Sequence, residues 1–170
     1  NGEIKQVLFI GQGTAAVAGQ AVSVYMEQIF AGRLAVGAMK ATELSGYRMR
    51  NDLSDSLIIA ISQSGTTTDT NRTIDMARER GAAVVGIVNR RNSDLTFKVD
   101  GVLYTSDGRD IEMSVASTKA FYSQVVAGYL IVFRLAQELG LLSEENLYRE
   151  LEELDRLPAL MRSVLSRETQ

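Results

Sequence analysis

Cysteine, histidine and tryptophan are absent from this sequence of 170 residues, and proline occurs once. Without cysteine and histidine, disulfides, thiolate nucleophiles, the usual zinc sites, Ser-His-Asp triads and imidazole acid–base catalysis are excluded within the chain. Chemistry here must therefore use carboxylates, lysine, hydroxyl groups or the backbone. We predict no catalytic residue, no metal and no cofactor in this chain.

An excess of positive charge is also lacking. Lysine and arginine number 18 against 21 acidic residues, for a formal net charge of -3, so nucleic acid is not an expected partner. The longest apolar stretch, residues 125–133, is too short to cross a bilayer, so no membrane partner is expected. No charged and then apolar leader follows Asn1, which predicts a cytoplasmic protein from which this segment was excised.

Five short apolar runs predict the buried strands of a parallel sheet, because each run is continuously hydrophobic rather than alternating. Helical patterns lie between most of them, and this alternation is typical of an α/β fold: a three-layer sandwich around a five-stranded parallel sheet. The runs are residues 6–10, 34–39, 56–62, 83–88 and 102–104.

Two of the predicted helices are expected to end at glycines, and two others have apolar faces that need a packing partner. Gly32 and Gly81 lie where left-handed caps would stop two of them. A helix over residues 117–138 is apolar on all sides in its middle, which predicts burial on more than one face, against another subunit or domain. Ser143 is expected to start a connector helix, and Pro158 to start a further helix with an apolar face.

The first candidate site is the loop of residues 62–67, between a strand and a helix. Ser62, Gln63, Ser64 and Thr67 would offer hydroxyl and N–H donors beside the positive end of the helix dipole, which suits a phosphate dianion. An equally good alternative is a polar loop in which Ser64 or Thr67 only caps its own helix.

A second loop, residues 11–16, formally matches the dinucleotide fingerprint G-x-G-x-x-G/A. That fingerprint also requires an acidic residue about 20 positions further on to hold the ribose, and Lys40 stands near the end of the second predicted strand instead. A tight turn that packs a helix closely on a strand explains the same glycines.

The third candidate is the stretch of residues 110–119, which leads into the apolar helix. Its serines and threonines could close over a ligand from the far side of the crevice. Glu112 fits a general base or a solvated loop carboxylate, and Lys119 fits an ion pair better than a Schiff base. Arg90 and Arg91 could steer an anion, although a solvated loop explains them as well.

Three of these motifs, in this order, resemble the sugar isomerase (SIS) domain family. The turn Gly13-Thr14, the stretch SQSGTTTDT at residues 62–70 and above all VASTKAF at residues 115–121 are similar to the first SIS domain of glucosamine-6-phosphate synthases. The resemblance covers roughly residues 7–140. Two positions depart from the family pattern, because Gln12 and Ala15 stand where cysteine and serine are usual.

The resemblance implies a flavodoxin-like SIS fold that binds a hexose 6-phosphate. The implied phosphate contacts are Ser62, Gln63, Ser64 and Thr67, and the implied sugar contacts are Gly13, Thr14, Val115 and Ser117. The loss of the hydroxyl at Ala15 and the larger side chain of Gln12 leave the identity of the sugar open.

The same resemblance implies a larger protein. Residues 1–142 would form the SIS domain, and residues 143–170 would connect it to a second SIS domain that carries most of the acid–base residues. A glutaminase domain would supply ammonia, and the protein would be a homo-oligomer. Two other classes remain open: a stand-alone regulatory module that senses sugar phosphates, and a dinucleotide-binding domain.

Overall fold

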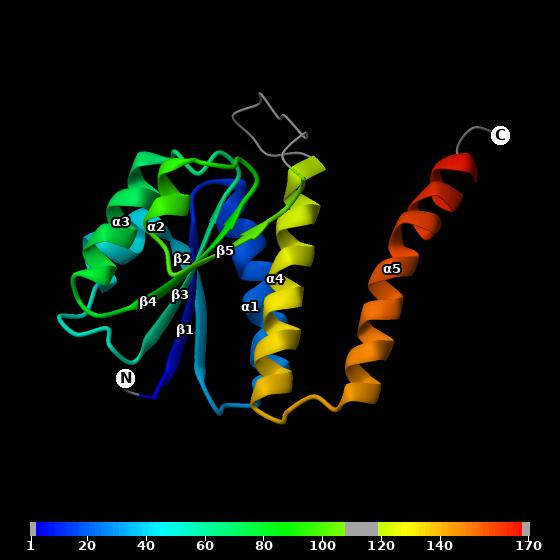
Figure 1. Ribbon diagram of the computed structural model, residues 1–170, viewed down its shortest axis with the longest axis horizontal. Helices are drawn as coiled ribbons and strands as arrows, with labels where there is room; N and C mark the ends of the chain where they lie inside the picture. Colours follow the sequence, from blue (N-terminus) through cyan, green and yellow to red (C-terminus); the bar gives the residue numbers. More distant parts are fainter. Residues whose placement is uncertain (1–2, 108–118, 168–170) are drawn as a thin grey trace. The chain divides into compact units, whose positions relative to one another are not determined.

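The computed structural model describes residues 3–107 and 119–167. Its sheet is parallel throughout, in the order β2-β1-β3-β4-β5 (Figure 1). The five-stranded parallel sheet predicted from the apolar runs is therefore confirmed. The strands are β1 Gln6–Gly11, β2 Ala35–Lys40, β3 Ser56–Ser62, β4 Ala83–Val88 and β5 Gly101–Tyr104.

Helices connect the strands, as the sequence predicts. Gly32 and Gly81 adopt positive φ angles of 81° and 89° just beyond the ends of α1 and α3, which confirms their role as stops. The helices are α1 Thr14–Phe30, α2 Ala41–Glu43, a π-helix η1 Leu44–Arg48, α3 Thr68–Arg78, a 3-10 turn η2 Asp94–Phe97, α4 Lys119–Glu138 and α5 Glu144–Arg167.

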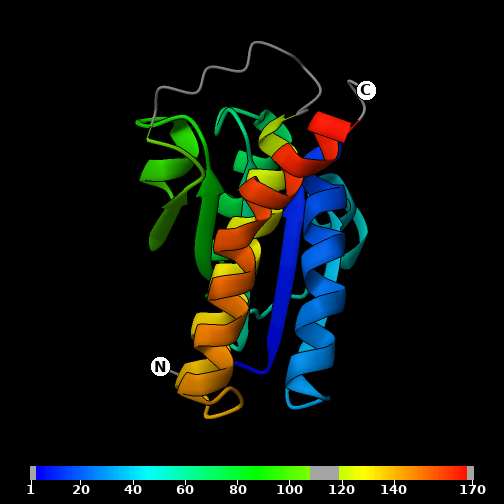
Figure 2. The same cartoon turned by 90° about the vertical axis from the view of Figure 1, so that its right-hand side faces the viewer.

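The two faces of the sheet are covered by different helices. On one face α1 runs alongside β1 (Figure 2), and a methyl group added at Gly19 would lie 3.1 Å from Phe9 Cβ. On the other face Ile74 and Ala77 of α3 join the strand residues in one core. The largest members of that core are Leu8, Ile10, Leu44, Leu53, Ile58, Ile74, Val84 and Leu95.

Helix α4, whose apolar middle predicts burial on more than one face, is partly exposed in this chain. Gln124 and Ala127 are buried, whereas Val125 is half-buried and Leu130 is 38% exposed. Within the described residues, the expected burial on more than one face is therefore only partial. Cover from another subunit or domain stays a prediction.

The chain divides into two compact units, Asn1–Val132 and Phe133–Gln170. The second unit corrects one expectation: α5 is a single helix, and Pro158 lies inside it instead of starting a new one. Proline has no N–H, so the Leu154 carbonyl loses its bond, but the turns on either side still hold the helix together. The large apolar side chains beyond Arg156 are at least 42% exposed: Leu157, Leu160, Met161, Val164 and Leu165.

One carboxylate stabilises the edge of the sheet in a pH-dependent way. Asp100 accepts the Val84 N–H at 2.8 Å and pairs with Arg78 at 2.7 Å. The bond from Val84, and after it Arg78, hold the pKa of Asp100 below its usual value. The stabilisation is therefore complete above the ordinary pKa and is lost as the pH falls through the lowered pKa.

We expect Asp100→Asn to lower the free energy of unfolding by about 1 kcal/mol or less at pH 7, because the carboxylate is half exposed. The difference from the parent protein should shrink as the pH falls below the ordinary carboxyl pKa of about 3.9 and through the lowered pKa of folded Asp100. Urea midpoints measured between pH 2 and pH 7 test this. A difference that stays constant over that range would contradict the role of the charge.

Candidate functional site

The candidate site lies where the carboxyl ends of β1 and β3 meet. These two strands are neighbours in the sheet, and their helices α1 and α3 lie on opposite faces. The chain therefore leaves the two strand ends in opposite directions, which in open α/β sheets opens a crevice for ligands. The loops at residues 11–14 and 62–67 both end at this edge, as predicted.

Hydroxyl groups fix the shape of the loop after β3. Ser62 Oγ accepts the Gly65 N–H at 3.0 Å and lies 3.4 Å from Thr67 Oγ1. Ser64 Oγ accepts from the N–H and the hydroxyl of Thr66, at 3.2 and 3.1 Å. As an acceptor in both bonds, the Ser64 hydroxyl keeps its own proton to donate.

The carbonyl groups of this loop are bonded to the neighbouring segment after β4. Gln63 O accepts the N–H groups of Asn89 and Arg90, both at 3.2 Å, and Gly65 O accepts the Leu95 N–H at 3.0 Å. A carbonyl oxygen that is paired in this way points toward its donor. Its partial negative charge is therefore kept away from a bound anion. Because the N–H groups of Gly65 and Thr66 are also paired within the loop, the donors left for a ligand are mainly hydroxyl groups.

The start of α3 carries no side-chain cap from its N-cap residue. Thr67 makes no such hydrogen bond, and Ser64 Oγ bonds to Thr66 instead of to the helix. The alternative that one of these hydroxyls simply caps α3 is therefore wrong. The N–H groups of the first helical turn have no partner within the helix, and together with the helix dipole they favour an anion.

Close packing at Gly65 holds the loop against its neighbour. Gly65 has a φ angle of 66°, and a Cβ added there would lie 1.9 Å from Ser93 Oγ. The Ser93 hydroxyl in turn donates to Arg90 O at 2.9 Å. Only glycine fits both the backbone angle and the space at this position.

The loop after β1 forms the opposite side of the crevice. Gly13 turns the chain with a φ angle of 57°, and Thr14 begins α1. Gln12 Nε2 donates to Asp69 Oδ2 at 3.3 Å and so links this loop to the first turn of α3. Among the predicted site residues, the structure thus gathers Gly13 and Thr14 at the same edge as the loop of residues 62–67.

Three of the predicted site residues cannot be placed at this edge. Val115, Ser117 and Glu112 lie outside the described residues. Arg91 lies 4.4 Å from the centre of the Tyr104 ring, so its guanidinium group is engaged in a cation–π contact.

Residues that sequence reasoning missed support the loop from behind. Ser93 contacts Gly65, and Asn89 Oδ1 accepts the Thr105 and Ser106 hydroxyls at 3.2 and 2.6 Å. A polar residue buried next to a strand end would have indicated this support. Sequence alone, however, does not show that Asn89 is buried.

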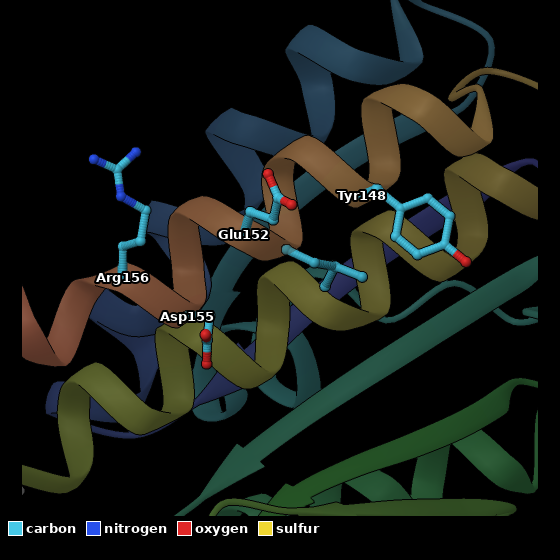
Figure 3. A pocket seen from close by; sticks show the side chains of 5 residues that line it. Tyr148, Glu152, Asp155 and Arg156 are labelled. Carbon is cyan, nitrogen blue, oxygen red and sulfur yellow. The ribbon is translucent and has the colours of Figure 1, made fainter.

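Two hollows on the described surface contain none of the predicted site residues. Figure 3 shows one of about 440 Å³, lined by α5 residues. The other, of about 330 Å³, lies beside η1 and the start of β1. The part of the chain that the structure describes contains no group of residues able to hold a metal ion, and none of its helices is long and apolar enough to cross a membrane.

A doubly wound parallel sheet with a hydroxyl-rich loop at its switch point places the chain among the open α/β domains, in which ligands bind beyond the carboxyl ends of the strands. Within that class, residues 3–134 match the SIS domain family. The chain belongs to this family.

The sequence of the chain is also similar to those of known enzymes. It is 37% identical over 166 residues to the glutamine–fructose-6-phosphate aminotransferase (isomerizing) of Mycolicibacterium paratuberculosis, covering 96% of this chain and 26% of that protein. The same enzyme of Clostridium tetani is 35% identical over 158 residues, covering 92% of this chain and 25% of that protein. The chain thus spans about a quarter of the length of these relatives.

A solved structure agrees with the sequence matches. The C-terminal domain of glucosamine-fructose-6-phosphate aminotransferase from Francisella tularensis superposes with a TM-score of 0.87 and 29% identity, covering 98% of this chain and 46% of that chain. The homology is consistent with a phosphosugar-binding isomerase domain.

Proposed function

We propose that this chain binds a hexose 6-phosphate at the carboxyl edge of its sheet. The observation that carries the proposal is the loop of residues 62–67, whose paired carbonyl groups and uncapped helix start leave donors for a dianion. Ser62, Gln63, Ser64 and Thr67 would contact the phosphate. The sugar would lie toward Gly13, Thr14, Val115 and Ser117.

In the whole protein, this chain would be the first half of the isomerase module of a glucosamine-6-phosphate synthase-like aminotransferase, which converts fructose 6-phosphate to glucosamine 6-phosphate. Residues 1–142 would bind the phosphosugar, and residues 143–170 would lead to a second SIS domain. Because the chain has no histidine, acid–base groups for ring opening would come mainly from that second domain. A glutaminase domain would supply ammonia, and the protein would be a homo-oligomer.

Removal of a phosphate donor should weaken binding. Ser64→Ala and Thr67→Ala each delete a hydroxyl next to the bound dianion, and hydrogen bonds to charged groups contribute about 1.5 to 3 kcal/mol. We therefore expect the dissociation constant for fructose 6-phosphate to rise about tenfold or more in each variant. Thermal-shift titrations with fructose 6-phosphate and glucosamine 6-phosphate measure this.

Inorganic phosphate and NAD serve as controls in the same titrations. A ligand at about 100 times its dissociation constant should add roughly 2.7 kcal/mol to the stability of the parent protein. Parent-like binding by both variants would leave the hydroxyls without a role in phosphate binding. Stabilisation by NAD alone would favour a dinucleotide site.

A stand-alone sugar-phosphate sensor is the alternative to an enzyme module. The two differ in what surrounds the SIS domain in the full open reading frame. A second SIS motif downstream supports the aminotransferase, and an upstream helix-turn-helix segment supports the regulator.

A further inference from the structure

A buried amide lies directly behind the loop of residues 62–67. Asn71 is the fourth residue of α3, on the face that packs toward the sheet, and it is only 7% exposed. Most buried side-chain polar atoms in folded proteins are hydrogen-bonded. The partners of Asn71 therefore show what its side chain does.

Both bonds of this amide go to the loop. Asn71 Nδ2 donates to Gly65 O and to Thr67 O, each at 3.1 Å. Gly65 O also accepts the Leu95 N–H, and Thr67 O also accepts the N–H of Asn71 itself, both at 3.0 Å. Asn71 thus ties the middle of the loop to its end.

The other side of the amide is unpaired. Asn71 Oδ1 is buried and has no hydrogen-bond partner. If the amide were rotated by half a turn, this oxygen would face the carbonyl oxygens of Gly65 and Thr67, which repel it. The donor role toward the loop therefore fixes the orientation of the side chain.

These bonds matter for an anion in front of the loop. A loop carbonyl that turned toward the ligand would place partial negative charge against the phosphate and remove the matching N–H from reach. Preorganised donors bind a dianion well because they need no rearrangement when the ligand arrives.

We propose that Asn71 is a positioning residue for phosphate binding: it holds the carbonyl groups of Gly65 and Thr67 behind the loop, so that the hydroxyls and the N–H groups at the start of α3 remain for the ligand. This inference rests on the proposed function, and it assigns no ligand contact to Asn71 itself.

Two substitutions test the proposal in the 170-residue chain. Asn71→Asp keeps the shape, but its carboxylate cannot donate to the two carbonyls, and it adds negative charge behind the loop. Asn71→Leu removes the polar group at similar volume. We expect the dissociation constant for fructose 6-phosphate to rise about 100-fold in Asn71→Asp, because the loop donors lose their support and the added negative charge repels the dianion. The rise in Asn71→Leu should be about tenfold, because no charge is added.

Thr73→Val is the matched control. Thr73 is also buried on α3, and its hydroxyl donates to the carbonyls of Ala41 and Asp69, away from the loop. The Thr73→Val substitution should lower the melting temperature without changing the dissociation constant for fructose 6-phosphate. Isothermal titration is carried out well below the melting temperature of every variant, so that loss of stability and loss of affinity are separated.

The outcomes are distinct. Weaker binding in folded Asn71→Leu, with parent-like binding in Thr73→Val, supports a positioning role. Parent-like affinity in both Asn71 variants, even with a lower melting temperature, would make Asn71 merely structural and overturn the inference while the proposed function stands. If the parent protein itself binds no sugar phosphate, the proposed function fails, and this inference falls with it. Should Asn71→Asp not fold, Asn71→Leu decides alone.

Discussion

Gly65→Ala should lower the free energy of unfolding by about 3 kcal/mol and abolish measurable binding of sugar phosphate. Two effects add. The left-handed backbone angle disfavours an L residue by about 1–2 kcal/mol, and overpacking of a filled site adds about 1–3 kcal/mol. The overpacking arises because the new methyl group would lie 1.9 Å from Ser93 Oγ and 2.7 Å from Ser93 Cβ.

Relief of this clash requires the loop or the segment after β4 to move. Either movement breaks the bond between Gly65 O and the Leu95 N–H and displaces the donors proposed to hold the phosphate. Calorimetry should show a melting temperature lower by about 6–12 °C for a domain of this size.

Gly32→Ala is the control for backbone strain alone. Gly32 also has a positive φ angle, but a Cβ added there meets nothing within 4 Å. The Gly32→Ala variant should be destabilised by about 1–2 kcal/mol and should bind sugar phosphate like the parent protein. Equal losses in the two variants would mean that the contact with Ser93 is unimportant.

Gly128→Ala should have the second large effect, on stability. At Gly128 the backbone of α4 lies directly on α1, and an added Cβ would lie 2.5 and 3.0 Å from the two methyl groups of the fully buried Val22. Overpacking here should lower the free energy of unfolding by about 1–3 kcal/mol, against a gain of about 1 kcal/mol in helix propensity. Urea denaturation measures the net loss.

Two further variants separate packing from propensity. In Gly46→Ala an added Cβ meets no atom within 4 Å, so this variant should be as stable as the parent or slightly more so. The double variant Val22→Ala with Gly128→Ala gives the new methyl group room. If the double variant loses as much stability as the two single changes added together, Gly128 and Val22 do not interact.

The strands were the most predictable part of this protein. The run at residues 56–62 coincides with β3, because a continuously apolar stretch closed by polar loops has few ways to be buried other than as a central parallel strand. Gly81 was equally clear, since a glycine after a helical pattern commonly takes the left-handed conformation.

Predictions failed where the local structure depends on distant parts of the chain or on the cooperativity of helix formation. Pro158 indicated a helix start, but α5 passes through it, since one missing bond does not outweigh the turns on both sides. The support that Ser93 and Asn71 give to the loop could not be found by spacing, because it depends on which polar side chains the fold buries together.

The strand order also determines where the molecule opens most readily. β1 and β3 are each paired on both sides, whereas β2 and β5 each have one neighbour and β5 has only four residues. Amide protons at the two edges should therefore exchange with solvent through small local openings, while those of β1 and β3 exchange only when the whole sheet unfolds. The loops that form the candidate site grow from these two central strands, so they are anchored to the slowest-exchanging part of the molecule even though the loops themselves lie at its rim.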